Sequence, residues 1–428
     1  MKRRRFQTVA VLFGNAAMFL ALSIAEASAS DSSIAVRATN QLGLELYGMC
    51  CRANGDSNLL LSPCSIQTAL AMCYAGADGD TRAEMQRALH YPQDEILLHK
   101  SFQTLWSVFN RAVSESRARL VQARAHGARL EPIEISFANR LFGQQGYGFQ
   151  EAFLNFVKEF YAAPMMAVDF ARKPEQSGGA INSWVARETH QKIRNVIPKN
   201  MLTPSTRLVL VNALYFKAAW EEPFETGLTK NRTFRIRGAG AKPVPTMTAL
   251  TSVGYAKLNG FSAIALPYGN CDFQFVILLP DEARELAAVE AKMTPEILDA
   301  CKQMPYQLIT LQMPKFKLQP DTMWLGKTLQ SLGMKSAFDL PPKSANFGRI
   351  APRKPDDYLF LSDVLHKTFI SVDEKGTEAA AATVMPMETG GGPPEKIMEI
   401  HVDRPFLFAI QHRETGACLF LGRVTDPR

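Results

Sequence analysis

The chain has 428 residues, of which 46% are hydrophobic and 21% charged, and its formal net charge is +7 at pH 7. Residues 1–29 hold four basic residues and one acidic residue, so the rest of the chain carries only +4, which does not indicate a nucleic-acid partner. No linker rich in Pro, Gly or Ser and no internal repeat divides the chain, and this predicts one large domain with a sizeable core.

The first 29 residues have the pattern of a secretory signal peptide. Basic residues open the chain, a mostly apolar run to Ile24 follows, and Ala27-Ser28-Ala29 has the small-x-small form of a cleavage site. The apolar run is too short and interrupted for a transmembrane anchor, and no later stretch is apolar enough to span a bilayer. We therefore expect cleavage after Ala29, a secreted, extracellular protein without a membrane partner, and a single domain over residues 30–428.

In chain order, the predicted elements alternate irregularly between helices and strands. Ser62 as N-cap and Pro63 as first helical residue mark one helix start, and periodicity places the others. The helices expected are Ile34–Met49, Pro63–Gly76, Thr81–Leu89, Phe102–Val113, Phe149–Tyr161 and Ile181–Arg187. The strands expected are Ile135–Phe142, Arg207–Phe216, Phe273–Leu279, Leu308–Leu318 with a bend at Pro314, Phe406–Ile410 and Cys418–Val424. Without a regular βαβ period, this order predicts an α+β fold.

The sequence lacks the motifs of common enzymes and metal sites. It has no Gly-x-Ser-x-Gly, no His-Glu-x-x-His and no glycine-rich phosphate loop, and its seven histidines are scattered. The seven cysteines match no metal-site spacing, and we prefer buried free thiols to a single disulfide. Asn231-Arg232-Thr233 is a glycosylation sequon only if the source is a eukaryote. We expect no enzymatic activity, no metal and no cofactor.

Residues 372–383 carry signals that conflict. Glu378 and the four alanines after it favour a helix, yet the stretch has no large apolar side chain after its first residue to dock one. Gly376 provides a hinge, and Pro386 and Gly390-Gly391-Gly392 break any regular element beyond. Small residues that fit almost any backbone indicate a segment that changes conformation.

Several motifs together resemble one family. The hinge of the reactive loop in inhibitory serpins is similar to Glu374-Lys375-Gly376-Thr377-Glu378-Ala379-Ala380-Ala381-Ala382-Thr383. Other segments that resemble the family are Ser62-Pro63-Cys64-Ser65-Ile66, Asn139-Arg140-Leu141-Phe142, Ile181-Asn182-Ser183-Trp184-Val185, Leu210–Trp220, Asp403–Phe408 and Phe420–Val424. The resemblance covers nearly all of residues 30–428. It implies a serpin fold of three β-sheets and eight or nine helices, with an exposed reactive-centre loop at about 374–398.

The resemblance implies a monomeric inhibitor of serine proteases, with cysteine proteases as a further target class. A protease would cut the loop as a substrate and form an acyl-enzyme, and the freed loop would insert as a strand into the largest sheet and trap the enzyme. The implied hinge residues are Glu374, Gly376, Thr377, Ala379, Ala380, Ala381 and Ala382. The alternative is a serpin that does not inhibit and serves as a carrier, chaperone or storage protein.

Strand alternation gives the inserted hinge a small inner face. Thr377, Ala379, Ala381 and Thr383 would point to the core together, and none of them is large or charged. Pro386 weakens the fit further along, because it lacks the N–H that a central strand donates.

The resemblance also places the reactive bond. Counted along the loop from its hinge, the bond is Thr389–Gly390 or Gly390–Gly391. Small residues there favour elastase-like or subtilisin-like proteases over trypsin-like enzymes, whose specificity pocket needs a cation. Met387 and Glu388 offer alternatives for a chymotrypsin-like or glutamate-specific enzyme.

Structural roles around the sheet are implied for a second group of residues. They are Ser62, Ser65, Asn212, Trp220, Lys315 and His366. His366 is expected to form hydrogen bonds behind the main sheet rather than to act in catalysis, and Lys315 is expected to pair with Glu374.

An arginine-rich stretch follows the predicted helix Phe102–Val113. It contains Arg111, Arg117, Arg119, Arg124 and Arg129. In some serpins this neighbourhood binds sulfated polysaccharides, and these arginines would supply a basic face. The preferred interpretation is a solvated insertion, because Glu115 and Glu131 lie among them.

Overall fold

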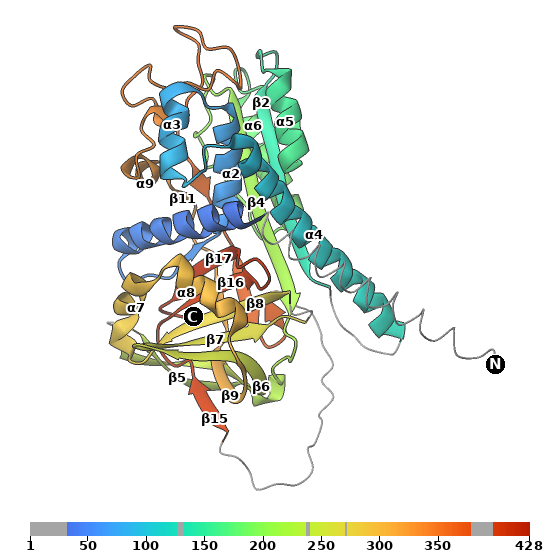
Figure 1. The fold of residues 1–428 in the computed structure, drawn as a ribbon, viewed down its shortest axis with the longest axis vertical. Coiled ribbons are helices and arrows are strands. Elements are labelled where there is room, and N and C mark those ends of the chain that lie inside the picture. Colours follow the sequence, from blue (N-terminus) through green and yellow to red (C-terminus); the bar gives the residue numbers. More distant parts are fainter. Residues whose placement is uncertain (1–31, 126–131, 237–239, 270–271, 378–396) are drawn as a thin grey trace, which may run out of the picture.

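The structure is a computed structural model that describes residues 32–125, 132–236, 240–269, 272–377 and 397–428. Within these ranges the strands form three sheets, of nine, six and two strands, and the helices are numbered up to α9 (Figure 1). The predicted α+β fold with three sheets is therefore confirmed. The expected signal peptide, Arg129, Ala379 to Ala382 and the bonds at Thr389 to Gly391 lie outside the described residues. None of the described helices is long and apolar enough to cross a membrane.

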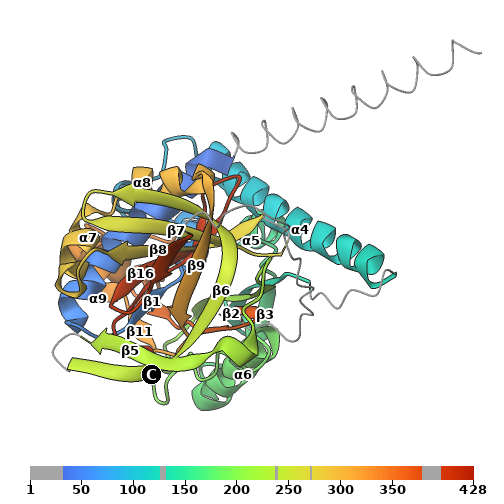
Figure 2. The same cartoon turned by 90° about the horizontal axis from the view of Figure 1, so that it is seen from below.

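The nine-stranded sheet forms the apolar centre of the molecule. Its order is β1–β17–β16–β8–β7–β6–β9–β15, with β5 beside β6 (Figure 2). Its strands are β1 (Leu59–Leu61), β5 (Lys230–Ile236), β6 (Gly240–Leu258), β7 (Phe261–Pro267), β8 (Phe273–Pro280), β9 (Tyr306–Pro314), β15 (Met398–His401), β16 (Phe406–His412) and β17 (Cys418–Val424). The strands β8, β16 and β17 are buried along their whole length, in agreement with the continuous apolar runs in their sequences.

The six-stranded sheet contains the candidate site, so the strand position at β14 is not in the largest sheet, where the resemblance implied that the loop would insert. Its order is β10–β13–β14–β4–β2–β3. Its strands are β2 (Glu134–Gln144), β3 (Met165–Val168), β4 (Leu208–Ala219), β10 (Phe316–Leu318), β13 (Ile370–Asp373) and β14 (Gly376–Thr377). The break between β9 and β10 falls at Lys315, next to the predicted bend at Pro314. A third sheet pairs β11 (Met323–Trp324) with β12 (Leu365–His366).

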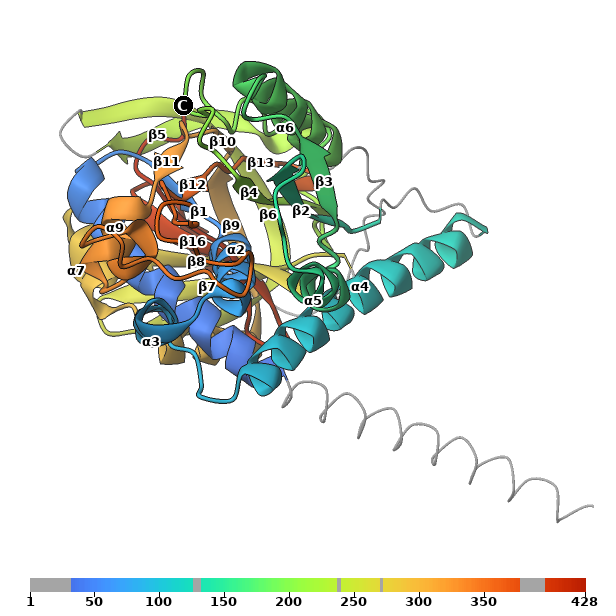
Figure 3. The ribbon, with the colours of Figure 1, turned by 90° about the horizontal axis from the view of Figure 1, so that it is seen from above.

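Helix α2 (Pro63–Gly76) packs against both β4 and β17 and so joins the two large sheets (Figures 1 and 3). Ser62 has the extended backbone of an N-cap, and its hydroxyl accepts a hydrogen bond from the backbone N–H of Ser65 at 3.4 Å. Pro63 is the first helical residue, as the sequence predicts. Nearly every residue of α2 is buried, because the helix packs beneath β4 on one side and against β17 on the other.

The two faces of β4 pack against different helices. Even-numbered residues from Leu208 to Ala218 face the core around α2, whereas Val211 and Ala213 pack with α6 (Pro174–Glu188). The other helices are residues 32–54, α3 (Gly79–Ala88), α5 (Glu151–Tyr161), α7 (Leu286–Lys292), α8 (Pro295–Ala300) and α9 (Gly326–Ser331).

Helix α4 (Glu95–Ala125) is longer than the sequence predicts. The expected end at Val113 was wrong, because buried apolar residues stop there while the helix continues into solvent, where Val121 is 73% exposed, away from the body of the domain (Figures 1 and 3). Arg117 and Arg119 therefore lie on the helix itself and not in an insertion after it.

Candidate functional site

The candidate site begins where the expected reactive loop leaves the six-stranded sheet. A two-residue turn follows β13 and leads into β14. Strand β14 is antiparallel to both of its neighbours, and Thr377 pairs with Val372 on β13 and with Ala218 on β4. The first residues of the loop thus already occupy a strand position between β13 and β4.

Gly376 allows this close approach. Its φ is +151°, and a Cβ atom at this position would lie 2.1 Å from the carbonyl oxygen of Ala218. No side chain fits there unless the backbone of β4 moves. The hinge role expected for Gly376 therefore has a steric basis in addition to flexibility.

Trp220 holds the turn and β14 together. Its indole N–H donates to the carbonyl of Asp373 at 2.9 Å, and its backbone N–H donates to Lys375 at 2.9 Å. The indole stacks on Tyr268 with ring centroids 4.8 Å apart, and the Tyr268 hydroxyl lies 2.6 Å from the hydroxyl of Thr377. This stacked aromatic pair therefore contacts Asp373 before the turn and Thr377 after it.

Glu374, in the turn, is buried and forms the expected pair with Lys315. Lys315 Nζ lies 2.8 Å from Glu374 Oε2, and the Thr229 hydroxyl donates to Oε1 at 2.8 Å. Burial raises the pKa of the Glu374 carboxyl, but the hydrogen bonds from Lys315 and Thr229 and the charge of Lys315 outweigh it and hold the pKa below its ordinary value. The carboxylate is therefore ionised at neutral pH and tethers the turn.

Behind the sheet, the other expected structural residues lie together. The backbone N–H of Ser62 donates to His366 Nε2 at 3.0 Å. The Ser65 hydroxyl donates to the side-chain carbonyl of Asn212, whose amide donates to Asn139. These hydrogen bonds connect the start of α2 to β2, β4 and β12.

His366 is neutral in this environment. Its side chain is buried, and burial lowers its pKa to about 3 because the charged ring would lose its hydration. Since Nε2 accepts from Ser62, the proton of the neutral ring is on Nδ1. This arrangement agrees with the structural role expected for His366.

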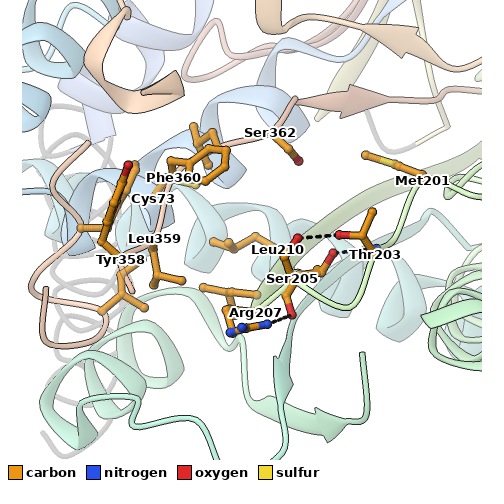
Figure 4. A pocket seen from close by; sticks show the side chains of 15 residues that line it. Cys73, Met201, Thr203, Ser205, Arg207, Leu210, Tyr358, Leu359, Phe360 and Ser362 are labelled. Carbon is orange, nitrogen blue, oxygen red and sulfur yellow. Dashed lines mark hydrogen bonds between the residues drawn. The ribbon is translucent and has the colours of Figure 1, made fainter. Parts of the chain in front are cut away.

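A cavity continues the strand position that β14 begins. Strand β14 ends at Thr377, and further along β4 a space of about 180 Å³ opens between this strand and residues 358–362 (Figure 4). A second space of about 130 Å³ adjoins it and extends to Leu365. Leu208 and Leu210 of β4 line both spaces, and Cys73 of α2 lies beneath. Leucines of β4 line the cavity together with the polar side chains of Thr203, Ser205 and Arg207, and the cavity has the dimensions of a few side chains.

Comparison with known proteins decides the family. A family model described as "Serpin (serine protease inhibitor)" matches residues 37–427. The chain belongs to the serpin family. It is 36% identical over 405 residues to the leukocyte elastase inhibitor of Bos taurus, with 91% of this serpin and 98% of that protein covered. Serpin B3 of Homo sapiens is 33% identical, with 88% of this serpin and 95% of that protein covered.

Solved structures agree. Cleaved Serpin 42Da has a TM-score of 0.77 and 26% identity, with 93% of this serpin and 100% of that chain covered. Uncleaved ovalbumin has the same TM-score and identity, with 92% of this serpin and 100% of that chain covered.

The structure of this serpin brings most predicted residues into two groups. Trp220, Lys315, Glu374 and the residues of β14 surround the hinge, and Ser62, Ser65, Asn212 and His366 lie behind the sheet. Sequence reasoning missed Tyr268 and Thr229 at the hinge. Neither lies in a recognisable motif, and only the fold brings them near Thr377 and Glu374.

The arginines on α4 are partly neutralised. The Arg111 guanidinium lies 3.3 Å from a carboxylate oxygen of Glu414, and that of Arg119 lies 3.5 Å from Glu115. Arg117 is exposed on the same helix, whereas Arg129 and the side chain of Arg124 are outside the described structure. The charge on this helix is thus lower than the sequence suggests.

We predict that Glu374→Lys promotes polymerisation through the loop and the sheet. The substitution places two ammonium groups against each other in a partly buried site, at a cost of about 2–3 kcal/mol, and removes the contacts of the turn with Lys315 and Thr229. Native gels after mild heating check this prediction. The double variant Glu374→Lys with Lys315→Glu restores opposite charges and is expected to stay monomeric; a single variant as monomeric as the wild type contradicts the prediction.

A second prediction concerns acid. Because the pKa of His366 falls from an ordinary value near 6.5 in the unfolded chain to about 3, stability is complete above about pH 6.5 and declines as the pH falls towards 3. His366→Gln keeps an acceptor for Ser62 but cannot titrate. As the pH falls below about 6.5, its unfolding free energy should therefore decline less steeply than that of the wild type, and the difference between the two slopes should be about 1.4 kcal/mol per pH unit. Thermal unfolding between pH 7 and 4 measures the slope. The exposed His401→Gln is the control and should follow the wild type.

Proposed function

We propose that this serpin inhibits serine proteases of the elastase-like or subtilisin-like class as a suicide substrate, with cysteine proteases as a further class. The observation that carries the proposal is β14, which starts a strand between β4 and β13 beside Ala218 and Ala219, while a cavity lies at the other end of β4, beside Leu208 and Leu210. A cleaved loop that continued from Thr377 would enter this position without any change of register.

The register of β14 assigns a partner on β4 to each loop residue up to Met387. Gly376 pairs with Ala219 and Thr377 with Ala218, so each further loop residue meets the next lower residue of β4. In this count Thr383 lies opposite Asn212, which hydrogen-bonds with Ser65 behind the sheet. The inward side chains of the inserted hinge, from Thr377 to Thr383, would therefore be small. They would lie where Asn212 and Ser65 already occupy the space behind the strand.

The same count places the larger loop residues at the cavity. Met385 and Met387 would lie opposite Leu210 and Leu208, whose side chains line it. A flexible thioether side chain suits such an irregular apolar space. Pro386 would point to the α6 face and would cost one ladder hydrogen bond while leaving the inner face unchanged.

The energy of insertion is large compared with what inhibition requires. About ten new ladder hydrogen bonds at ~1 kcal/mol net each provide on the order of 10 kcal/mol. A strand of about 16 residues would move an attached protease by roughly 50 Å. Displacement of an oxyanion hole by about an ångström already costs a protease much of its rate, so the acyl-enzyme would persist.

Secretion and polysaccharide binding are further parts of the proposal. Secretion after cleavage at Ala29 is supported by the basic, apolar and small-residue segments of residues 1–29. Binding of a sulfated polysaccharide to α4 is supported by its continuous helix with exposed Arg117 and opposed by the ion pairs of Arg111 and Arg119. A carrier, chaperone or storage role is the alternative to inhibition.

The test of the proposed function is incubation with pancreatic elastase, subtilisin and trypsin. We expect a denaturant-stable 1:1 complex with elastase or subtilisin and none with trypsin, because the residues at the expected bond are small and uncharged. Mass spectrometry of the C-terminal fragment is expected to place the cut at Thr389–Gly390 or Gly390–Gly391. Cleavage without a complex would favour the carrier alternative, and a complex cut before Met385 would contradict the register.

A pair of arginine substitutions tests the direction of the inserted side chains. Ala379→Arg would place a guanidinium against the buried Phe216 and Ile370, so we expect at least a tenfold rise in the stoichiometry of inhibition as hydrolysis overtakes insertion. Glu378→Arg adds the same side chain on the opposite face, beside half-buried Lys217 and Ser371, and should change the stoichiometry less than twofold. Equal effects of the two variants would refute the alternation.

A further inference from the structure

An apolar patch lies on the outer face of the nine-stranded sheet. It consists of Leu250 on β6, Tyr306 and Leu308 on β9, and Ile397 just before β15, with exposed fractions of 56%, 49%, 51% and 40%. The same strands bury Val253, Leu311 and other residues on their inner face. The outer face of a sheet with one solvated side is normally polar, so large apolar side chains gathered there require an explanation.

The register of the strands makes these side chains neighbours. Strands β6 and β9 are antiparallel and place Leu250 and Leu308 in diagonal positions. Strands β9 and β15 are parallel, with Ile309 beside Met398, which puts Ile397 beside Leu308. Tyr306 follows two positions along β9 on the same face, and its ring lies 5.5 Å from the guanidinium of Arg413. The four side chains thus form one apolar patch across adjacent strands.

The patch is continuous with the end of the expected reactive loop. Ile397 is the first described residue after the loop, and β15 leads from it into the core of the sheet. A protease that holds the loop in its cleft would therefore rest against this face. Glu399 and His401 on β15 are 3.1 Å apart and partner each other.

We infer that the apolar patch is a docking surface for the target protease, which contacts it with an apolar area beside its substrate cleft. This inference rests on the proposed function, because the loop brings the enzyme to this face. The contact raises the rate at which the loop is attacked. The contact does not change whether the acyl-enzyme is trapped or hydrolysed, because the loop would insert into the six-stranded sheet and the patch lies on the nine-stranded sheet.

The test compares the wild type with the double variant Leu250→Thr, Leu308→Thr, in which threonine keeps the β-preference of both positions. The rate constant for loss of intact chain is measured with pancreatic elastase and subtilisin, together with the stoichiometry of inhibition and the thermal midpoint. We expect the double variant to react about tenfold more slowly with at least one enzyme, as for the loss of two apolar contacts. Stoichiometry and thermal midpoint are expected to be unchanged.

Two controls separate docking from other effects. A free peptide of residues 374–398 measures the intrinsic rate at which each enzyme cuts the loop. Ile96→Thr removes a comparably exposed apolar side chain on the first turn of α4, far from β15 (Figure 1), and should react like the wild type. The reaction of the wild type should depend only weakly on salt, because the contact is apolar.

The outcomes are distinct. Equal rates for the double variant and the wild type overturn the docking surface, and so does faster cleavage, which would mean that the patch holds the loop itself. A wild-type dimer in sedimentation that the double variant abolishes also overturns it and assigns the patch to a second copy of the chain. Slower cleavage without any trapped complex supports docking while refuting inhibition, because the rate is measured whether or not the enzyme is trapped.

Discussion

The structure depends on a strand position between β4 and β13, which the described residues fill at Gly376 and Thr377. Strand β14 completes the sheet between β4 and β13 only at Gly376 and Thr377. Strand edges left without a partner normally attract other chains, and proteins avoid them. Here β14 lies between β4 and β13, so the segment best placed to pair with the rest of β4 is the one that β14 already starts. The contacts of Trp220, Tyr268 and the Lys315–Glu374 pair keep that start in register.

The residues behind this strand position combine a rigid helix with a cavity. Helix α2 provides a rigid floor, fixed by the cap at Ser62 and by the hydrogen bonds that Ser62 and Ser65 exchange with His366 and Asn212. These hydrogen bonds are buried or partly buried, and breaking one would leave an unpaired polar group at a large cost in free energy. They therefore fix the start of α2 against β4 and β12. The cavity lies beyond that place, between Leu208 and residues 358–362. Strand β4 therefore contributes both Asn212, in the hydrogen-bonded group behind the sheet, and Leu208, in the lining of the cavity.

The sequence predicted those parts of the fold that have local signals. Continuous apolar runs located β4, β8, β16 and β17, and the Ser62-Pro63 pair located the start of α2. The end of α4 was not predictable, because its outer turns have no apolar face to reveal them. Strand β14 was not predictable either, since its pairing depends on how closely Gly376 approaches Ala218, a contact between residues far apart in the chain. Likewise, the role of Tyr268 follows only from its stack on Trp220.

The position of the last strands determines what remains after the loop has been cut. Strands β16 and β17 follow the loop in sequence, yet β16 pairs with β8 and β17 pairs with β1, so both lie inside the nine-stranded sheet. A chain broken anywhere between residues 378 and 396 therefore becomes two polypeptides that share one hydrophobic core. The shorter polypeptide is retained by the burial of its side chains and by the ladder hydrogen bonds of β15, β16 and β17 to the rest of the sheet. After hydrolysis the two polypeptides therefore stay together as one particle, which differs from the intact chain by one added water and by a new pair of chain ends.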